Sequence, residues 1–349
     1  MHFSDIPADV LARFRDGVVI PAQPLALNAQ RQFDVQRQRA LTRYYADAGA
    51  GGLAVGVHTT QFAIRDVGLY LPVLEAAAQT VSDWTERPLV MIAGVAGRTA
   101  QAVAEARTAR ALGYHAVLLS LAALKGCSED ELIEHCQVIA AEMPLIGFYL
   151  QPAVGGMALG ASFWRRFAGI DNVIGIKVAP FNRYATLDVM AGVAAARAGD
   201  RVTLYTGNDD HIVLDLVTPF RTELGNLHFA GGLLGHWSVW TQKAVGILER
   251  CKAASQQDAV PMNVLALDSA VTDCNAAFFD VANAFHGVIA GCHEVLRRQG
   301  LLEGRWCLDP DEDLSPGQSE AIDRVYRLYP ELNDDAFVKA NLERWLVDA

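Results

Sequence analysis

The feature that most constrains the fold of this chain is a succession of eight short apolar runs with helical patterns between them. The runs cover residues 18–21, 52–57, 89–94, 116–120, 145–150, 173–178, 202–206 and 227–231. Most of them begin roughly 25 to 37 residues apart, which is about the length of one strand and one helix. Alternating strands and helices form parallel sheets, and eight such units close into a barrel. We therefore predict an α/β fold, a (β/α)8 TIM barrel.

The segments between the runs support this prediction. The segment Thr99–Leu112 is rich in alanine, Ser128 and Glu131 form a capping box at the start of a helix that runs to Ala140, and Asn182–Ala198 is another alanine-rich helix. The alternative is a doubly wound open sheet. Neither a GxGxxG fingerprint nor a Walker loop follows any of the runs, so the common nucleotide motifs do not favour that alternative.

The chain of 349 residues is longer than the roughly 250 that a barrel needs. After the eighth run, Pro261–Gln299 and Ser315–Leu346 have helical patterns without strands between them, and the acidic stretch Leu308–Gly317 is typical of a loop. We predict a barrel over residues 1–252 and a C-terminal helical extension over residues 253–349.

Composition narrows the classes of partner. A hydrophobic content of 52% excludes intrinsic disorder, and a net charge of −11 argues against nucleic acid or an anionic membrane as partner. No apolar stretch reaches the roughly 18 residues of a membrane span, and the acidic segment Met1–Asp16 lacks the apolar core of a signal peptide. The six cysteines form no CxxC pair and are expected to be reduced core residues of a cytoplasmic protein.

Lys177 is the most informative single residue. The chain has 29 basic residues, of which only five are lysine, and Lys177 is the one that falls within an apolar run. Because side chains alternate along a strand, we expect Val173, Gly175 and Lys177 to share one face. By the same rule Leu145, Gly147 and Tyr149 share a face of the preceding run, so a lysine and a tyrosine would lie on adjacent strands above two glycines.

This pair predicts covalent chemistry. A buried lysine has a lowered pKa and supplies the neutral amine that attacks a carbonyl carbon. A neighbouring phenol could carry the protons of carbinolamine formation and dehydration. The competing interpretation is a lysine that pairs with a carboxylate in the barrel or extends its amine out to water.

Five further residues are candidates for substrate binding. His58 follows the second run, where it could bind a substrate carboxylate or act as a base, or simply bond to a loop backbone. Thr59 and Thr60 are hydroxyl donors there but also common helix caps. Gln151 follows the fifth run, and Gly231 ends the eighth, where its backbone could approach an anion or form a tight turn.

A metal site is a weaker hypothesis. Carboxylate and imidazole ligands suit a divalent ion, and these residue types gather late in the barrel, at Asp209, Asp210, His211, His228 and His236. The two adjacent aspartates are at least as typical of a helix N-cap. We expect neither a metal nor an organic cofactor.

Several motifs resemble those of one family in order and spacing. They are Ala48–Gly56, Ile92–Val95, Ala111–Val117, the Tyr-x-x-Pro of Tyr149–Pro152, the Gly-Ile-Lys of Gly175–Lys177 and the Thr-Gly-Asn-Asp of Thr206–Asp209. From Val18 to Trp237 the chain resembles the dihydrodipicolinate synthase / N-acetylneuraminate lyase family of class I aldolases.

The resemblance implies a barrel with a helical extension, usually assembled as a homotetramer. It also implies an imine between a lysine and a 2-oxo acid, commonly pyruvate, with Lys177 as the nucleophile and Tyr149 as the acid and base. The expected partners are therefore a small 2-oxo acid and further copies of the chain, as a tetramer or a dimer.

The chain departs from the family pattern at three places. Val57 and His58 stand where the family has two threonines that bind the carboxylate, although Thr59 and Thr60 could serve after a shift of two positions. The loop 120–126 lacks the second tyrosine of the synthases, and Val154 replaces their arginine. We predict a divergent Schiff-base lyase, either an aldolase or a hydratase-aldolase or dehydratase. The alternatives are a non-catalytic regulatory barrel that binds a 2-oxo acid, a true dihydrodipicolinate synthase, and a metal-dependent aldolase.

Overall fold

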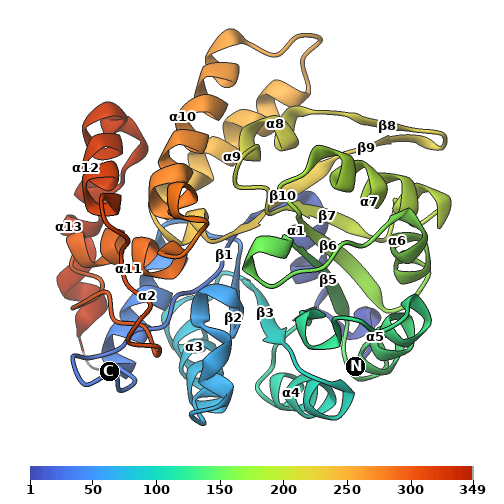
Figure 1. Ribbon diagram of the computed structural model, residues 1–349, viewed down its shortest axis with the longest axis horizontal. Helices are drawn as coiled ribbons and strands as arrows, with labels where there is room; N and C mark the ends of the chain where they lie inside the picture. The colour runs from blue at the N-terminus through green and yellow to red at the C-terminus, as the bar shows by residue number, and fades with distance from the viewer. Residues whose placement is uncertain (348–349) are drawn as a thin grey trace.

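The computed structural model describes residues 1–347 and contains one sheet of eight parallel strands (Figure 1). The strands are β1 (Val19–Pro21), β2 (Gly52–Val55), β3 (Val90–Val95), β4 (Ala116–Leu119), β5 (Leu145–Leu150), β6 (Val173–Ala179), β7 (Thr203–Thr206) and β10 (Phe229–Leu234). Their order is β1-β10-β7-β6-β5-β4-β3-β2, and an isolated parallel bridge between Ala22 and Ala54 joins the two ends. The predicted TIM barrel is confirmed.

The last strand lies further along the chain than predicted. Residues 220–227 form a short antiparallel hairpin of β8 (Phe220–Thr222) and β9 (Gly225–Leu227), in which Leu227 pairs with Phe220. The apolar run that was expected to begin the eighth strand at Leu227 therefore contributes its first residue to the hairpin. The barrel strand begins two residues later, at Phe229.

The helices of the barrel lie outside the strands. They are α2 (Val35–Asp47), α3 (Tyr70–Trp84), α4 (Thr99–Ala111), α5 (Glu129–Glu142), α6 (Ala161–Ala168), α7 (Arg183–Ala195), α8 (Ile212–Val217) and α9 (Thr241–Ser255). The predicted capping box is present, because the Ser128 hydroxyl accepts from the Glu131 amide and the Glu131 carboxylate accepts from the Ser128 amide at 2.7 Å.

An N-terminal helix, α1 (Ala8–Asp16), closes the amino end of the barrel. Phe14 stacks on Tyr205 with ring centroids 4.9 Å apart, and the Tyr205 hydroxyl donates to the Phe14 carbonyl at 2.7 Å. A Cβ on Gly175 would lie 2.8 Å from the Phe14 ring, so this glycine makes room for the helix. Any pocket inside the barrel must therefore open at the carboxyl ends of the strands.

The C-terminal part contains α10 (Met262–Phe278), α11 (Val288–Arg298), α12 (Gln318–Leu328) and α13 (Asp335–Leu346), which lie together on one side of the barrel (Figure 1). The helix predicted over 261–299 is interrupted at residues 279–287, which we call the strap. The predicted boundary after residue 252 falls inside α9, and the division of the chain into barrel and extension stays a prediction.

Two general expectations can be compared with the described residues. All six cysteines are free thiols, and five of them are buried. Nowhere in residues 1–347 is there a helix with the length and apolar character needed to cross a membrane.

Candidate active site

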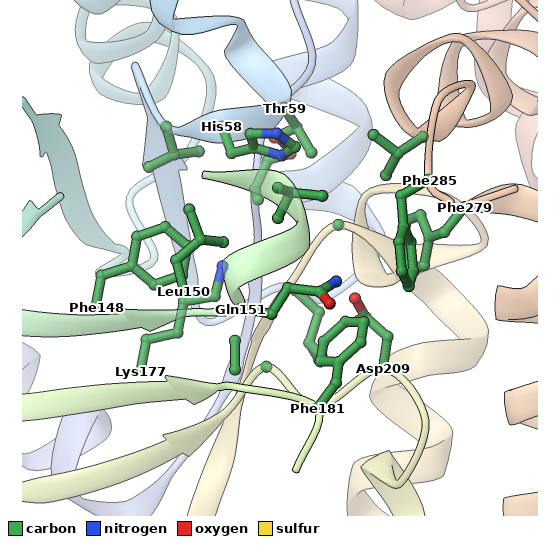
Figure 2. A pocket seen from close by; sticks show the side chains of 18 residues that line it. His58, Thr59, Phe148, Leu150, Gln151, Lys177, Phe181, Asp209, Phe279 and Phe285 are labelled. Carbon is green, nitrogen blue, oxygen red and sulfur yellow. Dashed lines mark hydrogen bonds between the residues drawn. The ribbon is translucent and has the colours of Figure 1, made fainter. Parts of the chain in front are cut away.

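A pocket with about 570 Å³ of empty space, including its mouth, lies at the carboxyl ends of the barrel strands. Its polar lining consists of His58, Thr59, Gln151, Lys177 and Asp209 (Figure 2). The rest of the lining is apolar, and part of it comes from the strap and the start of α11. Residues more than a hundred positions apart in the sequence thus meet around one cavity.

Lys177 lies on β6 and extends into this pocket, with 7% of its surface exposed. Burial lowers the pKa of its amine, since a charged ammonium loses hydration there. The ring of Phe148, the neighbour of Lys177 on β5, lies 4.3 Å from the amine nitrogen. The structure therefore places an amine with a lowered pKa in a cavity that a small molecule can enter, as the sequence predicted.

Asp209 is the second ionisable group of the pocket and was not among the predicted substrate-binding or catalytic residues. Its Oδ1 is buried and makes no hydrogen bond among the described residues. Burial raises the pKa of this carboxyl, while the charge of Lys177 lowers it; in turn, the carboxylate raises the pKa of the lysine. The match of Thr206–Asp209 to a family motif was the sequence signal that pointed to this residue.

The loop that carries Asp209 is fixed from behind by Asp215 of α8. This fully buried carboxylate accepts from the Thr206 hydroxyl at 2.6 Å and from the Asn208 amide at 3.0 Å. Gly207 lies between them, and a Cβ there would approach within 2.8 Å of Lys177 Cε. The sequence Thr-Gly-Asn-Asp thus allows the loop to pass close to the lysine and directs the aspartate into the pocket.

The prediction that Tyr149 faces the pocket beside Lys177 is wrong. Tyr149 belongs to the apolar layer between the barrel and its helices, where its ring lies 5.1 Å from that of Trp164. Its hydroxyl accepts a hydrogen bond from the Leu159 amide at 3.1 Å. Gly147 also faces outward, because a Cβ there would lie 2.7 Å from Phe167.

A register shift in β6 explains the error. Leu145 pairs with Val173, but Ile146 pairs with Gly175, so β6 has one extra residue at this point. The side chains before and after such a bulge no longer alternate regularly. Val173 therefore faces the outer layer whereas Lys177 faces the interior, and Lys177 pairs with Phe148 rather than with Tyr149.

His58 and Thr59 both line the pocket, as predicted. The His58 ring is half-buried, and burial together with the charge of Lys177 lowers its pKa to about 4, so the ring is neutral at neutral pH. The Thr59 hydroxyl donates to the Ala22 carbonyl at 2.6 Å. Within residues 1–347, the backbone amides of His58 and Thr59 make no hydrogen bond and so can donate to a ligand.

Of the remaining three candidates, one lines the pocket and two do not. Gln151 lines the pocket, and its amide points toward the same space as the Asp209 carboxyl (Figure 2). Thr60 does not line the pocket, since its hydroxyl donates to the Gln23 carbonyl and accepts from the Gly56 amide. Gly231 does not line it either: a Cβ there would meet the Val18 backbone at 2.5 Å, so the glycine allows β10 to pass close to β1.

The side chains considered as metal ligands are not arranged around a common point. No group of three or more histidine, cysteine, aspartate or glutamate side chains in the described part of the chain is arranged to hold a metal ion. The helix-cap alternative for Asp209 and Asp210 is also wrong, because His211 is the N-cap of α8. His236 lies 5.7 Å from the ring of Phe278, stacked on it in the apolar layer.

An eight-stranded barrel with a buried lysine near the carboxyl end of a strand has the parts that a class I aldolase needs, and the comparisons with known proteins agree. Residues 16–219 match the model of the dihydrodipicolinate synthetase family, and the chain belongs to this family. The family consists of aldolases and lyases of class I.

Individual relatives are distant. The chain is 23% identical to N-acetylneuraminate lyase 2 of Escherichia coli O6:H1 over 91% of this chain and 94% of the lyase. It is 26% identical to 4-hydroxy-tetrahydrodipicolinate synthase of Moorella thermoacetica over 58% of this chain and 66% of the synthase.

Among solved structures, dihydrodipicolinate synthase from Oceanobacillus iheyensis superposes with a TM-score of 0.73 at 16% identity, covering 93% of this chain and 99% of the synthase. N-acetylneuraminate lyase from Fusobacterium nucleatum, in complex with pyruvate, gives a TM-score of 0.70 at 18% identity, covering 90% and 97%. At these identities the likeness supports the fold.

Proposed function

We propose that this protein is a Schiff-base-forming lyase that acts on a 2-oxo acid such as pyruvate or one of its aldol adducts. The observation that carries the proposal is the pair of Lys177 and Asp209 in one pocket. Lys177 is buried with a lowered pKa, and Asp209 has a carboxyl oxygen without a hydrogen bond among residues 1–347. A neutral amine beside an acid is the combination that imine formation needs.

The chemistry begins with attack of the neutral Lys177 nitrogen on carbon 2 of the oxo acid. The carbonyl oxygen takes up a proton to give a carbinolamine, which loses water to form an iminium ion. This cation accepts an electron pair when the bond between carbons 3 and 4 breaks in an aldol cleavage. In a dehydration a base removes a proton from carbon 3, the electron pair of that C–H bond passes to the iminium to form an enamine, and the hydroxyl on carbon 4 is then protonated and leaves as water.

Asp209 takes the proton-transfer role that was predicted for Tyr149. A carboxyl with a raised pKa can give a proton to a leaving hydroxyl and, as a carboxylate, can remove one from a substrate hydroxyl. The ring of Phe148 above the nitrogen would stabilise the positive charge of the iminium ion. The free backbone amides of His58 and Thr59 are the donors that we assign to the substrate carboxylate.

The experiment is trapping by borohydride in the presence of pyruvate, followed by mass analysis of the intact chain and of its peptides. We expect a single reduced pyruvyl group on Lys177 in the wild type and none in Lys177→Met. Lys125→Met is the matched control, because Lys125 lies in a loop and does not line the pocket. Absence of an adduct with every 2-oxo acid tried would contradict the proposal.

A non-catalytic 2-oxo-acid-binding barrel is the second candidate. It is favoured by the position of Tyr149, which offers no hydroxyl to the pocket. This candidate predicts the adduct on Lys177 without turnover, so cleavage or dehydration of any substrate would reject it. Dihydrodipicolinate synthesis is disfavoured, because Val154 presents an apolar side chain to the pocket where the synthases resembled by this sequence have an arginine.

A further inference from the structure

The pocket has a polar end and an apolar end. Lys177 and His58 lie at one end, whereas the opposite wall is built from Phe181, Phe279 and Phe285 (Figure 2). The rings of Phe181 and Phe285 meet edge to face with centroids 5.8 Å apart. Both are only half-buried, so a ligand that covers them removes further aromatic surface from water.

This wall is unsuited to a polyhydroxylated substrate. Each buried hydroxyl without a hydrogen-bond partner costs about 1–3 kcal/mol. His58 and Thr59 lie at the lysine end, so the polar side chains nearer the aromatic wall are Gln151 and Asp209, and both point into the same space. One hydroxyl next to the reacting carbon can be bonded there, but a chain of several hydroxyls would face phenylalanine rings.

The aromatic wall is held in place by hydrogen bonds behind it. Phe285 lies in the strap with a backbone φ of +67°, and Phe181 has a φ of +50°, both in the left-handed region that costs energy for a bulky residue. The Phe181 amide donates to the Asn208 side chain at 3.1 Å. Such conformations persist only where their surroundings enforce them.

The strap itself is fixed by Asp280 and Gln318. The Asp280 carboxylate accepts from the Gly287 amide at 3.0 Å and from the Ser315 hydroxyl at 2.5 Å, and the Gln318 side chain donates to the Gly287 carbonyl at 3.0 Å. The C-terminal helices thus hold two phenylalanines over the mouth of the barrel. Their rings are preorganised to receive a flat apolar group.

We propose that the group attached to carbon 4 of the substrate is an aryl group, and that the C-terminal strap selects it through Phe279 and Phe285. This inference rests on the proposed function, because it concerns the half of the substrate that does not form the imine.

The reaction is cleavage of a 4-aryl-4-hydroxy-2-oxo acid. The bond between carbons 3 and 4 breaks, and its electron pair forms the enamine on Lys177. The proton of the carbon 4 hydroxyl passes to Asp209, which releases an aromatic aldehyde. Protonation of carbon 3 and hydrolysis of the imine by one water then release pyruvate.

The test compares two adducts of pyruvate, one with benzaldehyde and one with glyceraldehyde, by the rate of pyruvate release. We expect kcat/KM to be about 100-fold higher for the phenyl adduct, the size of selectivity that apolar pockets achieve. Phe285→Ser is expected to lower this value about 10-fold. Phe285→Leu, which keeps the wall apolar, should retain most of it.

Two controls make the outcome interpretable. Met262→Ala changes an apolar side chain that is 77% exposed at the start of α10 and should leave both rates unchanged. Trapping of pyruvate on Lys177 should be the same in the wild type and in the three variants, which shows that the variants are folded and form the imine.

If the adduct forms but the glyceraldehyde compound is cleaved as fast or faster, or neither compound is cleaved, the aryl inference is overturned and the imine stands. If no adduct forms with any 2-oxo acid, the proposed function fails first.

Discussion

At the scale of single residues, the site depends on the electrostatic balance between Lys177 and Asp209. Lys177 is buried, Asp209 has a buried Oδ1, and each group favours the charged form of the other. Because burial alone would favour the neutral form of both groups, we propose that their mutual attraction keeps a proton available for transfer to and from the substrate.

Replacement of Asp209 by asparagine gives the first prediction. The carboxylate raises the pKa of Lys177, so its removal lowers that pKa further. The pH at which borohydride trapping reaches half its maximum should therefore move to lower pH, while turnover falls about 100-fold because the acid is lost. Asp188→Asn on the exposed side of α7 is the control. A trapping profile that stays in place or moves to higher pH would contradict the assigned coupling.

Tyr149 provides the second prediction. A residue that transfers protons in the transition state contributes about 10²- to 10⁴-fold to the rate. Since the Tyr149 hydroxyl bonds the Leu159 amide outside the barrel, Tyr149→Phe should change kcat by less than about 3-fold. Loss of that hydrogen bond should lower the free energy of unfolding by about 1 kcal/mol. A loss of kcat of two orders of magnitude would restore the role predicted from the sequence.

At the scale of the elements, the ends of β2 and β3 are held together by a buried ion pair. Arg65 Nε and Glu105 Oε1 are 2.9 Å apart with both side chains less than a tenth exposed. Arg65 also donates to the carbonyls of Gly56 and Gly94, which fixes the start of the loop that carries His58 and Thr59. The pair thus connects α4 to the lining of the pocket.

Removal of one partner tests this connection. Glu105→Ala leaves a buried guanidinium unpaired and should lower the free energy of unfolding by about 3–5 kcal/mol, measured by urea denaturation. Among the folded molecules, KM for pyruvate should rise because the loop loses its anchor. Glu129→Ala removes a partly exposed pair with Arg166 and should cost less than about 1 kcal/mol. Equal losses in the two variants would show that the buried pair has no special role.

At the scale of the whole molecule, α1 closes the amino end of the barrel, and the strap and the start of α11 reach the pocket at its carboxyl end. The Asn275 side chain of α10 donates to the Asp209 carbonyl at 2.6 Å, so the C-terminal part contacts the loop that carries Asp209 and also supplies part of the aromatic wall. The sequence assigned these residues to a surplus beyond the barrel. They nevertheless form part of the pocket, since Phe279, Phe285 and Val288 line it.

The closure at the amino end can be tested through Phe14. This side chain is 1% exposed, and its ring packs against Gly175 inside the barrel. Phe14→Ala should lower the free energy of unfolding by about 3–5 kcal/mol through the cavity it leaves, whereas Leu71→Ala on the exposed face of α3 should change it by less than about 0.5 kcal/mol. Thermal or urea unfolding measures both. A small effect of Phe14→Ala would mean that α1 is only loosely attached to the barrel.

The predicted homo-oligomer also belongs to this scale and stays a prediction. Tyr184 of α7 and Leu224 in the turn of the β8–β9 hairpin are 83% and 59% exposed, so their side chains are available for contact with another copy of the chain. Light scattering of the purified chain measures its mass directly. A dimer or tetramer agrees with the prediction, and a monomer at all concentrations contradicts it.

The sequence by itself determined the architecture and singled out the lysine that we propose as the nucleophile. Eight apolar runs with helices between them permit few closed arrangements, and a lysine in an apolar strand stands out because burying a charge without function is costly. The fifth apolar run also predicted the first and the last residue of β5 correctly.

Only the tertiary structure decided which side chains meet the lysine. A single extra residue in β6 reverses the faces of its side chains, and no periodic pattern shows such a bulge, so Tyr149 was assigned to the wrong side of the barrel. The aromatic wall could not be predicted either, because Phe181 and Phe285 are 104 positions apart and meet only where helices far along the chain fold back over the strands. Local periodicity determines the elements, whereas long-range packing determines the pocket.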